Sequence, residues 1–170
     1  MGFTPLDGII MGTRCGSIDP SIVTYIAGLE SMPESDVSRL LNNESGLLGV
    51  SGVSSDCRDV QAAAKAGNKR AQLALDMLEY QLVKLIGSYA GALGGVDAIL
   101  FTGGIGENDI GLREKVLRDL AYLGVTADPK ANDCRGEEVR ISGADSKVEG
   151  WVVPTNEEIM IARDTAELIK

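Results

Sequence analysis

The sequence predicts an α/β fold that is rich in helices and contains a small sheet. The apolar stretch 96–101 lies between two pairs of glycines and is typical of a short strand. A helical pattern that begins at Asp109 follows it. A second apolar stretch, 150–153, ends at Pro154 and is also followed by a helical pattern. We therefore expect both stretches in one small sheet with helices on both sides.

The composition is that of one globular domain over residues 1–170. Hydrophobic residues make up 44% of the chain and charged residues 24%, which are ordinary values, and the length allows a real core. The net charge is -9 and no basic run occurs, which argues against nucleic acid or an anionic membrane as a partner. A few local cations can still bind ATP despite this overall charge.

The chain contains three widely spaced cysteines and no histidine. The cysteines do not have the spacing of a zinc site or of a disulfide framework, and they fit a reducing cytoplasm. We expect the protein there also because the start of the sequence does not resemble a signal peptide. Any general base must be a carboxylate or belong to another polypeptide. The most apolar helical stretch, 82–93, is interrupted by a lysine and two glycines and is too short to span a bilayer.

The first third of the chain is predicted to be helical, with one long loop. A helix begins at Pro20, with Asp19 as its N-cap, because a capping aspartate followed by proline is typical of a helix start. A second helix runs from about Glu34 and ends at Gly46. The segment 47–56 is rich in glycine and serine and is predicted to be a loop.

Two further helices are expected before the central strand. The first is short and covers 58–66. The second is the longest helix of the chain, which Asn68 can cap and which continues to about residue 93. Apolar residues at helical spacing on this helix are predicted to face the core: Ala71, Leu75, Leu78, Leu82, Leu85, Ile86 and Tyr89.

After the central strand, a glycine turn over 103–106 leads into the helix that begins at Asp109. The alternating segment 138–142 is predicted to be a half-exposed strand. The last helix is predicted to begin with Thr155 as its N-cap. Glu158 then falls three positions later and completes a capping box, in which the hydroxyl and the carboxylate each accept a backbone N–H.

The glycine turn is a candidate nucleotide-binding segment. Glycines remove the Cβ atoms that keep a ligand away from the backbone, and a helix start offers unpaired N–H groups. The turn matches neither the G-x-G-x-x-G dinucleotide fingerprint, because Asp109 stands where the last glycine should be, nor a P-loop, because no Gly-Lys-Ser or Gly-Lys-Thr follows. The alternative is that the glycines only allow a buried strand to turn into a helix.

Three further positions carry candidate chemistry. Glu157 is a spare carboxylate after a strand end and suits Mg²⁺; the alternative is a solvated helix-start glutamate. The segment 56–58 offers an aspartate for ribose hydroxyls and an arginine plane for a purine, or else a capping aspartate with a surface arginine. Arg14, in a glycine-flanked loop, offers a cation for a phosphoryl group, or else a structural pair with a carboxylate such as Asp19.

Four motifs in this order give the chain a family resemblance. They are Gly-Thr-Arg at 12–14, Ser-Ser-Asp-Cys-Arg at 54–58, Gly-Gly-Ile-Gly-Glu-Asn at 103–108 and Thr-Asn-Glu-Glu at 155–158. Over nearly its whole length the chain resembles the C-terminal part of the acetate and propionate kinases, a family of the superfamily of sugar kinases, actin and heat-shock chaperone ATPases. The resemblance implies part of an actin-like, ribonuclease-H-like ATPase domain.

The resemblance also implies a role for each matched residue. Arg14 corresponds to the arginine that binds the phosphoryl group in flight, and Pro5 to a residue that lines the pocket for the acyl methyl group. Glu157 corresponds to the Mg²⁺ carboxylate. Two segments correspond to the nucleotide site: Asp56, Cys57 and Arg58, where the family usually has Met or Phe in the middle position, and Gly104, Ile105, Gly106, Glu107 and Asn108.

The implied activity is transfer of the ATP γ-phosphoryl group to acetate or propionate, with Mg²⁺, to give an acyl phosphate and ADP. Family members are about twice as long, so the N-terminal half, with its phosphate loop and further catalytic residues, is expected to be absent, and the isolated chain is predicted to be inactive. The family also implies a homodimer. A non-catalytic nucleotide-binding or dimerisation module is the alternative function.

Overall fold

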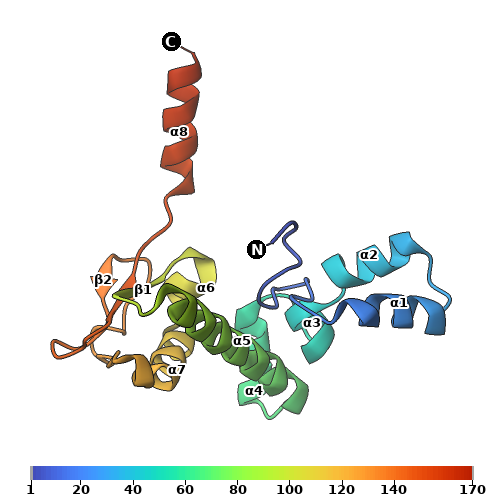
Figure 1. The fold of residues 1–170 in the computed structure, drawn as a ribbon, viewed down its shortest axis with the longest axis horizontal. Helices are drawn as coiled ribbons and strands as arrows, with labels where there is room; N and C mark the ends of the chain where they lie inside the picture. Colours follow the sequence, from blue (N-terminus) through green and yellow to red (C-terminus); the bar gives the residue numbers. More distant parts are fainter. Residues whose placement is uncertain (1, 170) are drawn as a thin grey trace. The chain divides into compact units, whose positions relative to one another are not determined.

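The computed structural model describes residues 2–169, and it describes Glu157 by its backbone only. Contacts within the chain divide it into two compact units, Met1–Tyr89 and Ala90–Lys170. Figure 1 shows the elements of both. The division falls inside the longest helix. That the chain forms a single domain stays a prediction.

The first unit is helical, as predicted, but it contains a helix that the sequence does not reveal. The first part of the predicted loop 47–56 forms a short helix that ends at Ser51, so the prediction is wrong for these residues, while 52–56 form a loop as predicted. The glycines and serines of this short helix have low helix propensity, and packing on the segment that precedes α1 overrides this propensity. The helices of this unit are α1 (Pro20–Leu29), α2 (Glu34–Asn43), α3 (Gly46–Ser51), α4 (Cys57–Lys65) and most of α5 (Lys69–Leu93).

Two predicted helix caps are confirmed in this unit. The Asp19 carboxylate accepts a hydrogen bond from the Ser21 N–H at 2.8 Å, and Pro20 occupies the first helical position. The Asn68 side chain accepts hydrogen bonds from the first N–H groups of α5, those of Arg70 and Ala71. Each cap satisfies backbone donors that have no partner within the helix.

The apolar stripe predicted on α5 is only partly buried. Ala71 and Leu78 belong to the core of the first unit, but Tyr89 is 62% exposed. The core of this unit also contains Ile10, whose N–H donates to the Gln81 Oε1 atom at 2.6 Å and so ties the N-terminal segment to α5.

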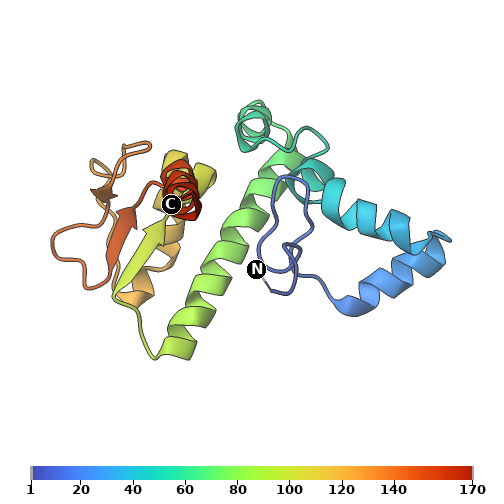
Figure 2. The same cartoon turned by 90° about the horizontal axis from the view of Figure 1, so that it is seen from above.

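The second unit contains the small sheet, and the predicted α/β class is confirmed. The strands are β1 (Ala98–Phe101), β2 (Val139–Arg140) and β3 (Glu149–Val152), in the order β1-β3-β2. β1 and β3 are parallel and lie side by side (Figure 2), while β2 is antiparallel to β3. The helices are α6 (Gly103–Asn108), α7 (Ile110–Asp119), the 3-10 helix η1 (Ala121–Leu123) and α8 (Glu157–Leu168).

One face of this sheet is packed and the other is largely open. α7 covers the packed face closely, since a Cβ atom on Gly150 of β3 would lie 3.4 Å from the Leu117 side chain. On the opposite face of β1, Leu100 is 60% exposed. The small sheet among helices is as predicted, while this face of β1 stays largely open among the described residues. Side chains alternate between the two faces of a strand, which is why neighbours such as Leu100 and Phe101 differ in burial.

Within residues 2–169, we find no helix that combines the length and the apolar character needed to cross a membrane.

Candidate functional site

The backbone around Arg14 is pinned by the start of α3 and the residues just before it. The N–H groups of Leu47 and Leu48 donate to the carbonyls of Met11 and Gly12, each at 2.9 Å. The Ser45 N–H donates to the Thr13 carbonyl at 2.9 Å, and the Cys15 N–H to the Leu41 carbonyl at 3.0 Å. These long-range hydrogen bonds fix the path of a loop that has no regular structure of its own.

Gly46 allows this close approach. Its φ is +61°, and a Cβ atom there would lie 2.2 Å from the Met11 carbonyl oxygen and 2.7 Å from that of Arg14. No side chain fits into this space. Position 46 is thus reserved for glycine both by conformation and by packing, a requirement that the sequence pattern alone does not reveal.

Arg14 is half-buried, and its guanidinium makes no ion pair or hydrogen bond with any other side chain that the structure describes. The predicted alternative, a pair with Asp19, is absent among these residues, because the Asp19 carboxylate caps α1. A cation on a fixed loop without a described partner retains its hydrogen-bonding capacity for a ligand. This arrangement suits an anion such as a phosphoryl group.

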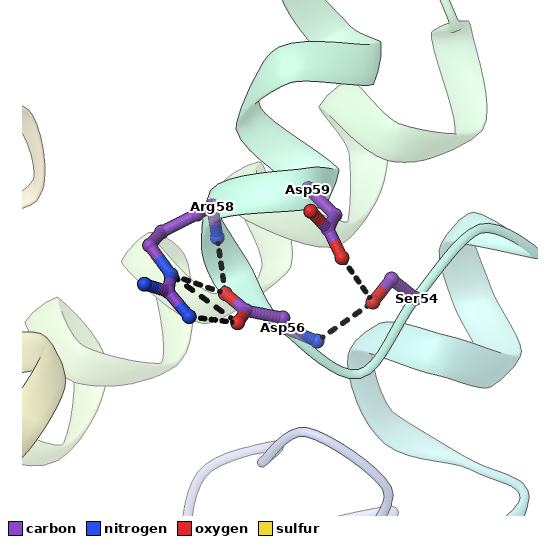
Figure 3. Close-up of polar contacts among 4 residues, drawn as sticks. All are labelled: Ser54, Asp56, Arg58 and Asp59. Atoms are coloured by element: carbon purple, nitrogen blue, oxygen red, sulfur yellow. Dashed lines mark hydrogen bonds and ion pairs between the residues drawn. The ribbon is translucent and has the colours of Figure 1, made fainter.

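The predicted nucleoside segment lies at the start of α4, where Asp56 is the N-cap. Figure 3 shows its carboxylate accepting hydrogen bonds from the Arg58 N–H at 2.9 Å and from the Arg58 guanidinium at 3.0 Å, while Ser54 Oγ accepts from the Asp56 N–H and donates to Asp59. The side-chain and backbone hydrogen bonds from Arg58 lower the pKa of Asp56 to about 2. Asp56 is therefore ionised at neutral pH.

The local role predicted as the alternative, a capping aspartate beside a surface arginine, is thus present. The Arg58 side chain is 88% exposed, and its plane is accessible. Hydrogen bonds and charge from Asp56 raise the pKa of Arg58 and fix its position. Cys57, half-buried, is the first residue of α4. A nucleoside role for the three residues stays a prediction.

The predicted glycine turn is itself a short helix, α6, and its glycines serve different purposes. Gly103 has φ +71°, a conformation that favours glycine. Gly106 lies against the end of β1, where a Cβ atom would be 3.2 Å from the Phe101 carbonyl carbon. Gly104 is exposed, and a Cβ atom there would have no neighbour within 4 Å. The structure of the chain therefore explains the first two glycines but not the third.

Glu107 joins α6 to the segment that follows β3. Its Oε1 atom accepts hydrogen bonds from the Gly103 N–H at 2.9 Å and from the Thr155 N–H at 2.8 Å. The Thr155 hydroxyl also accepts from the Gly103 N–H at 3.2 Å and is hydrogen-bonded to the Thr102 hydroxyl. The segments after two neighbouring parallel strands are thus tied together by one carboxylate and two hydroxyls.

The sequence reasoning did not identify Arg113, which holds the other end of α6. This α7 residue is 0% exposed and donates from Nη1 to the carbonyls of Gly106 and Glu107 at 2.9 and 2.8 Å. Nε and Nη2 donate to Asn132 and Cys134, each at 2.8 Å. Burial lowers the pKa of the Arg113 guanidinium. Its position on the apolar face of α7, three residues after Ile110 and three before Val116, is a sequence signal that could have found it.

The predicted capping box at the start of α8 is wrong. The N-cap is Asn156, whose side chain accepts a hydrogen bond from the Ile159 N–H at 3.1 Å. Thr155 is used instead in the contacts with Gly103 and Glu107. Glu158 is then one position too early for a capping box and is exposed. The Glu157 backbone begins α8, but its side chain, and with it the predicted metal ligand, lies outside the described part of the structure.

The predicted residues fall in both units. Pro5, Arg14 and the segment 56–58 belong to the first unit, and Pro5 is exposed in a turn in which the Asp7 N–H donates to the Thr4 carbonyl. The segment 104–108 and Glu157 belong to the second unit, where the contacts of Glu107 and Thr155 bring α6 and the start of α8 together.

Comparison with known proteins gives a consistent result. The sequence model of the Acetokinase family matches residues 1–163. The chain is 51% identical over 170 residues to an acetate kinase of Halothermothrix orenii and 55% identical over 170 residues to one of Symbiobacterium thermophilum. Both matches include 100% of this chain and 43% of the relative. The chain therefore spans less than half the length of these curated relatives.

Solved structures agree with this result. The crystal structure of Porphyromonas gingivalis acetate kinase matches 100% of this chain and 43% of its own, with a TM-score of 0.94 and 48% identity. The crystal structure of a Francisella tularensis propionate kinase matches 96% of this chain and 41% of its own, with a TM-score of 0.87 and 40% identity. The fold of the chain is thus that of a substantial part of these kinases.

Proposed function

The chain belongs to the acetokinase family, and we propose that it forms the C-terminal part of a phosphotransferase that moves the γ-phosphoryl group of ATP to acetate or propionate. The products are an acyl phosphate and ADP. Relatives named acetate kinase and a structural neighbour named propionate kinase support both acceptors. The remaining half of the active site comes from an N-terminal half, and the isolated chain is inactive.

The observation that carries this proposal is that the Arg14 side chain has no partner among the described residues. Phosphoryl transfer spreads negative charge over the oxygens of the moving group, and catalysis consists mainly of positioning and of stabilising that charge. Arg14 brings a guanidinium with no partner among the described residues, on a loop that α3 holds in place. Because the backbone that carries the donor is already fixed, less reorganisation is needed when the charge develops.

The nucleotide is proposed to contact two segments. Asp56, Cys57 and Arg58 receive the adenosine, with the Arg58 plane against the base. The segment 104–108 offers the open backbone at Gly104, where a Cβ atom would have no described residue within 4 Å apart from the adjoining residues and the backbone of its own helix. Pro5 is proposed to line the pocket for the acyl methyl group.

Mg²⁺ is proposed to bind at the start of α8, through Glu157. The described residues form no group of three or more His, Cys, Asp or Glu that could hold a metal ion. In kinases Mg²⁺ keeps several waters and is bound by one or two carboxylates together with substrate phosphates, so a single carboxylate at position 157 suits it. When bound, the ion neutralises charge on the phosphate oxygens. We place the enzyme in the cytoplasm, as a homodimer.

Mutation of Arg14 tests the proposal in the intact enzyme, which here means this sequence joined to the N-terminal half that its relatives carry. Arg14→Ala is expected to lower kcat about 10²–10³-fold, the scale for one transition-state donor, with a smaller change in ATP affinity. Arg14→Lys is expected to rescue poorly, because an ammonium lacks the planar fork. Acyl phosphate formation and calorimetric ATP titration provide the two measurements.

Arg39→Ala is the matched control, because it removes a cation from the same unit that already pairs with Asp36 and Glu44. Its kcat should stay within about twofold of wild type, since such exposed pairs contribute little. Wild-type kcat in Arg14→Ala would refute the assignment.

A second candidate function is a non-catalytic nucleotide-binding or dimerisation module. The observation that favours it is the exposure of α8, where every described side chain is exposed, among them the apolar Ile159, Met160, Ile161 and Leu168. Exposed apolar groups of this kind mark interaction surfaces. Dimerisation of the chain without nucleotide binding or kinase activity, even after addition of the N-terminal half, would favour this second function.

A further inference from the structure

We propose that Glu107 is a positioning residue whose carboxylate couples the nucleotide segment to the metal-binding start of α8. The inference rests on the proposed function, which places nucleotide at 104–108 and Mg²⁺ at Glu157. It differs from a direct nucleotide contact, because the Glu107 Oε1 atom is already used inside the protein.

The carboxylate holds two segments that are far apart in sequence. Oε1 accepts the N–H of Gly103, the first residue of α6, and the N–H of Thr155, which lies after β3. Both donors are backbone groups that neither the sheet nor a helix satisfies. One acceptor oxygen with two lone pairs therefore ties the two segments together, beside the hydrogen bonds that the Thr155 hydroxyl makes with Gly103 and Thr102.

The backbone of Glu107 is fixed from the opposite side. Its carbonyl accepts a hydrogen bond from Nη1 of the buried Arg113 at 2.8 Å, and the neighbouring Gly106 carbonyl accepts from the same atom. Arg113 is itself held by Asn132 and Cys134. The backbone that carries the Glu107 side chain is therefore fixed. The hydrogen bonds of that side chain then constrain the position of Thr155 relative to α6.

Thr155 is two residues before Glu157, and only Asn156, the N-cap of α8, lies between them. Any displacement of Thr155 relative to α6 therefore moves the proposed metal carboxylate relative to the proposed nucleotide segment. Kinases bind Mg²⁺ together with nucleotide phosphates, so the spacing of these two segments decides how strongly the ion and the nucleotide assist each other. Glu107 sets that spacing.

The chemistry of the contact predicts which substitutions are tolerated. Both partners are N–H donors, so an amide oxygen can replace the carboxylate oxygen, and Glu107→Gln should retain the contact. Glu107→Ala removes the acceptor. Glu158→Ala is the matched control, because it also removes one carboxylate near the start of α8, yet Glu158 makes no hydrogen bond or ion pair with another described residue.

The experiment titrates ADP into the intact enzyme by calorimetry, with and without Mg²⁺. The Kd for ADP without Mg²⁺, divided by the Kd with Mg²⁺, measures the coupling between the ion and the nucleotide. Glu107→Ala is expected to lower this ratio by about fivefold or more, a typical scale for coupling between sites, whereas Glu107→Gln and Glu158→Ala keep it near the wild-type value. In the Glu157→Ala background, Glu107→Ala should have no further effect on the ratio.

Hydrogen exchange at the Thr155 amide tests the contact without any ligand. Protection should fall in Glu107→Ala and remain in Glu107→Gln, with folding of the second unit checked by the fluorescence of Trp151. Unchanged protection in Glu107→Ala, an equal loss of coupling in Glu107→Gln, or additive effects of Glu107→Ala and Glu157→Ala would each overturn the inference. If Glu157→Ala leaves the Mg²⁺ dependence unchanged, the proposed metal role fails, and the exchange data still decide whether Glu107 joins the two segments.

Discussion

Two short, glycine-rich helices, α3 in the first unit and α6 in the second, have a similar C-terminal end. In each, an arginine from the next long helix binds the last carbonyl groups. Arg70 of α5 donates to Gly49 and Val50 of α3, each at 2.8 Å, and Arg113 of α7 donates to Gly106 and Glu107 of α6. These carbonyls have no partner within their own helix.

The difference between the two arginines is burial. Arg70 is exposed, whereas Arg113 is 0% exposed and also binds Asn132 and Cys134. Water can replace an exposed donor but cannot reach a buried carbonyl. We infer that α6 depends on its arginine and that α3 does not. The comparison indicates that an arginine bound to two carbonyl groups at the end of a helix can matter more to stability when it is buried.

The largest expected effect is that of Arg113→Ala. It leaves the carbonyls of Gly106, Asn132 and Cys134 without this donor, while the Glu107 carbonyl keeps the Gly136 N–H at 3.4 Å. An unsatisfied buried group costs about 1–3 kcal/mol, so the second unit should lose at least about 3 kcal/mol. Denaturant unfolding followed by Trp151 fluorescence reports on this unit, because Trp151 is the only tryptophan of the chain and lies in β3. Arg113→Lys, with a single donor group, should recover only part of the loss. A loss below about 1 kcal/mol for Arg113→Ala would remove the distinction between the two helices.

The second-largest effect is expected from a substitution of Gly104 in α6, which differs from the glycines of α3. In α3 a Cβ atom on Gly49 would lie 2.6 Å from the Glu44 carbonyl oxygen, whereas in α6 a Cβ atom on Gly104 meets nothing. Gly104→Val should therefore leave the melting temperature nearly unchanged, since valine also has the higher helix propensity. We expect it to weaken ADP binding to the intact enzyme by about tenfold or more, because the branched side chain fills the space of the ligand.

Calorimetric ADP titration measures this effect. Gly28→Val is the matched control, because Gly28 is also an exposed helical glycine whose Cβ position is open. It should leave the Kd for ADP unchanged. Wild-type ADP affinity in a folded Gly104→Val variant would remove the 104–108 segment from the proposed nucleotide site.

Much of the fold could be predicted because its signals are local. Asp19, Asn68 and Asp109 each precede a helical pattern and cap the helix that follows. The two longer strands are apolar runs bounded by glycine or proline. The signals for α3 and α6 are not local, because glycine-rich segments favour loops. The arginines that bind their carbonyls lie 20 and 21 positions away for α3 and 6 and 7 positions away for α6.

The candidate site was predicted less completely, for a related reason. Arg14, the segment 56–58 and the segment 104–108 stand out through their residue types, but their roles stay predictions. The N-cap of α8 was placed one residue early because Thr155 is a good capping residue by itself. Its hydroxyl is used by Gly103 and Thr102, more than 50 residues earlier in the chain, which no local pattern reveals.

The smallest expected effect is that of Arg70→Ala. The C-terminal end of α3 is also capped without Arg70, since Gly52 adopts φ +66° and its N–H donates to the Leu48 carbonyl at 2.8 Å. Water can also bind the Gly49 and Val50 carbonyls once Arg70 is removed. The first unit should therefore lose less than about 1 kcal/mol, measured by helical circular dichroism during denaturation. The loop of Arg14 is held by Leu47 and Leu48, at the other end of α3, so kcat of the intact enzyme should stay within about twofold of wild type. A drop in kcat comparable to that of Arg14→Ala would show that the two ends of α3 act together on the loop and that its arginine matters as much as that of α6.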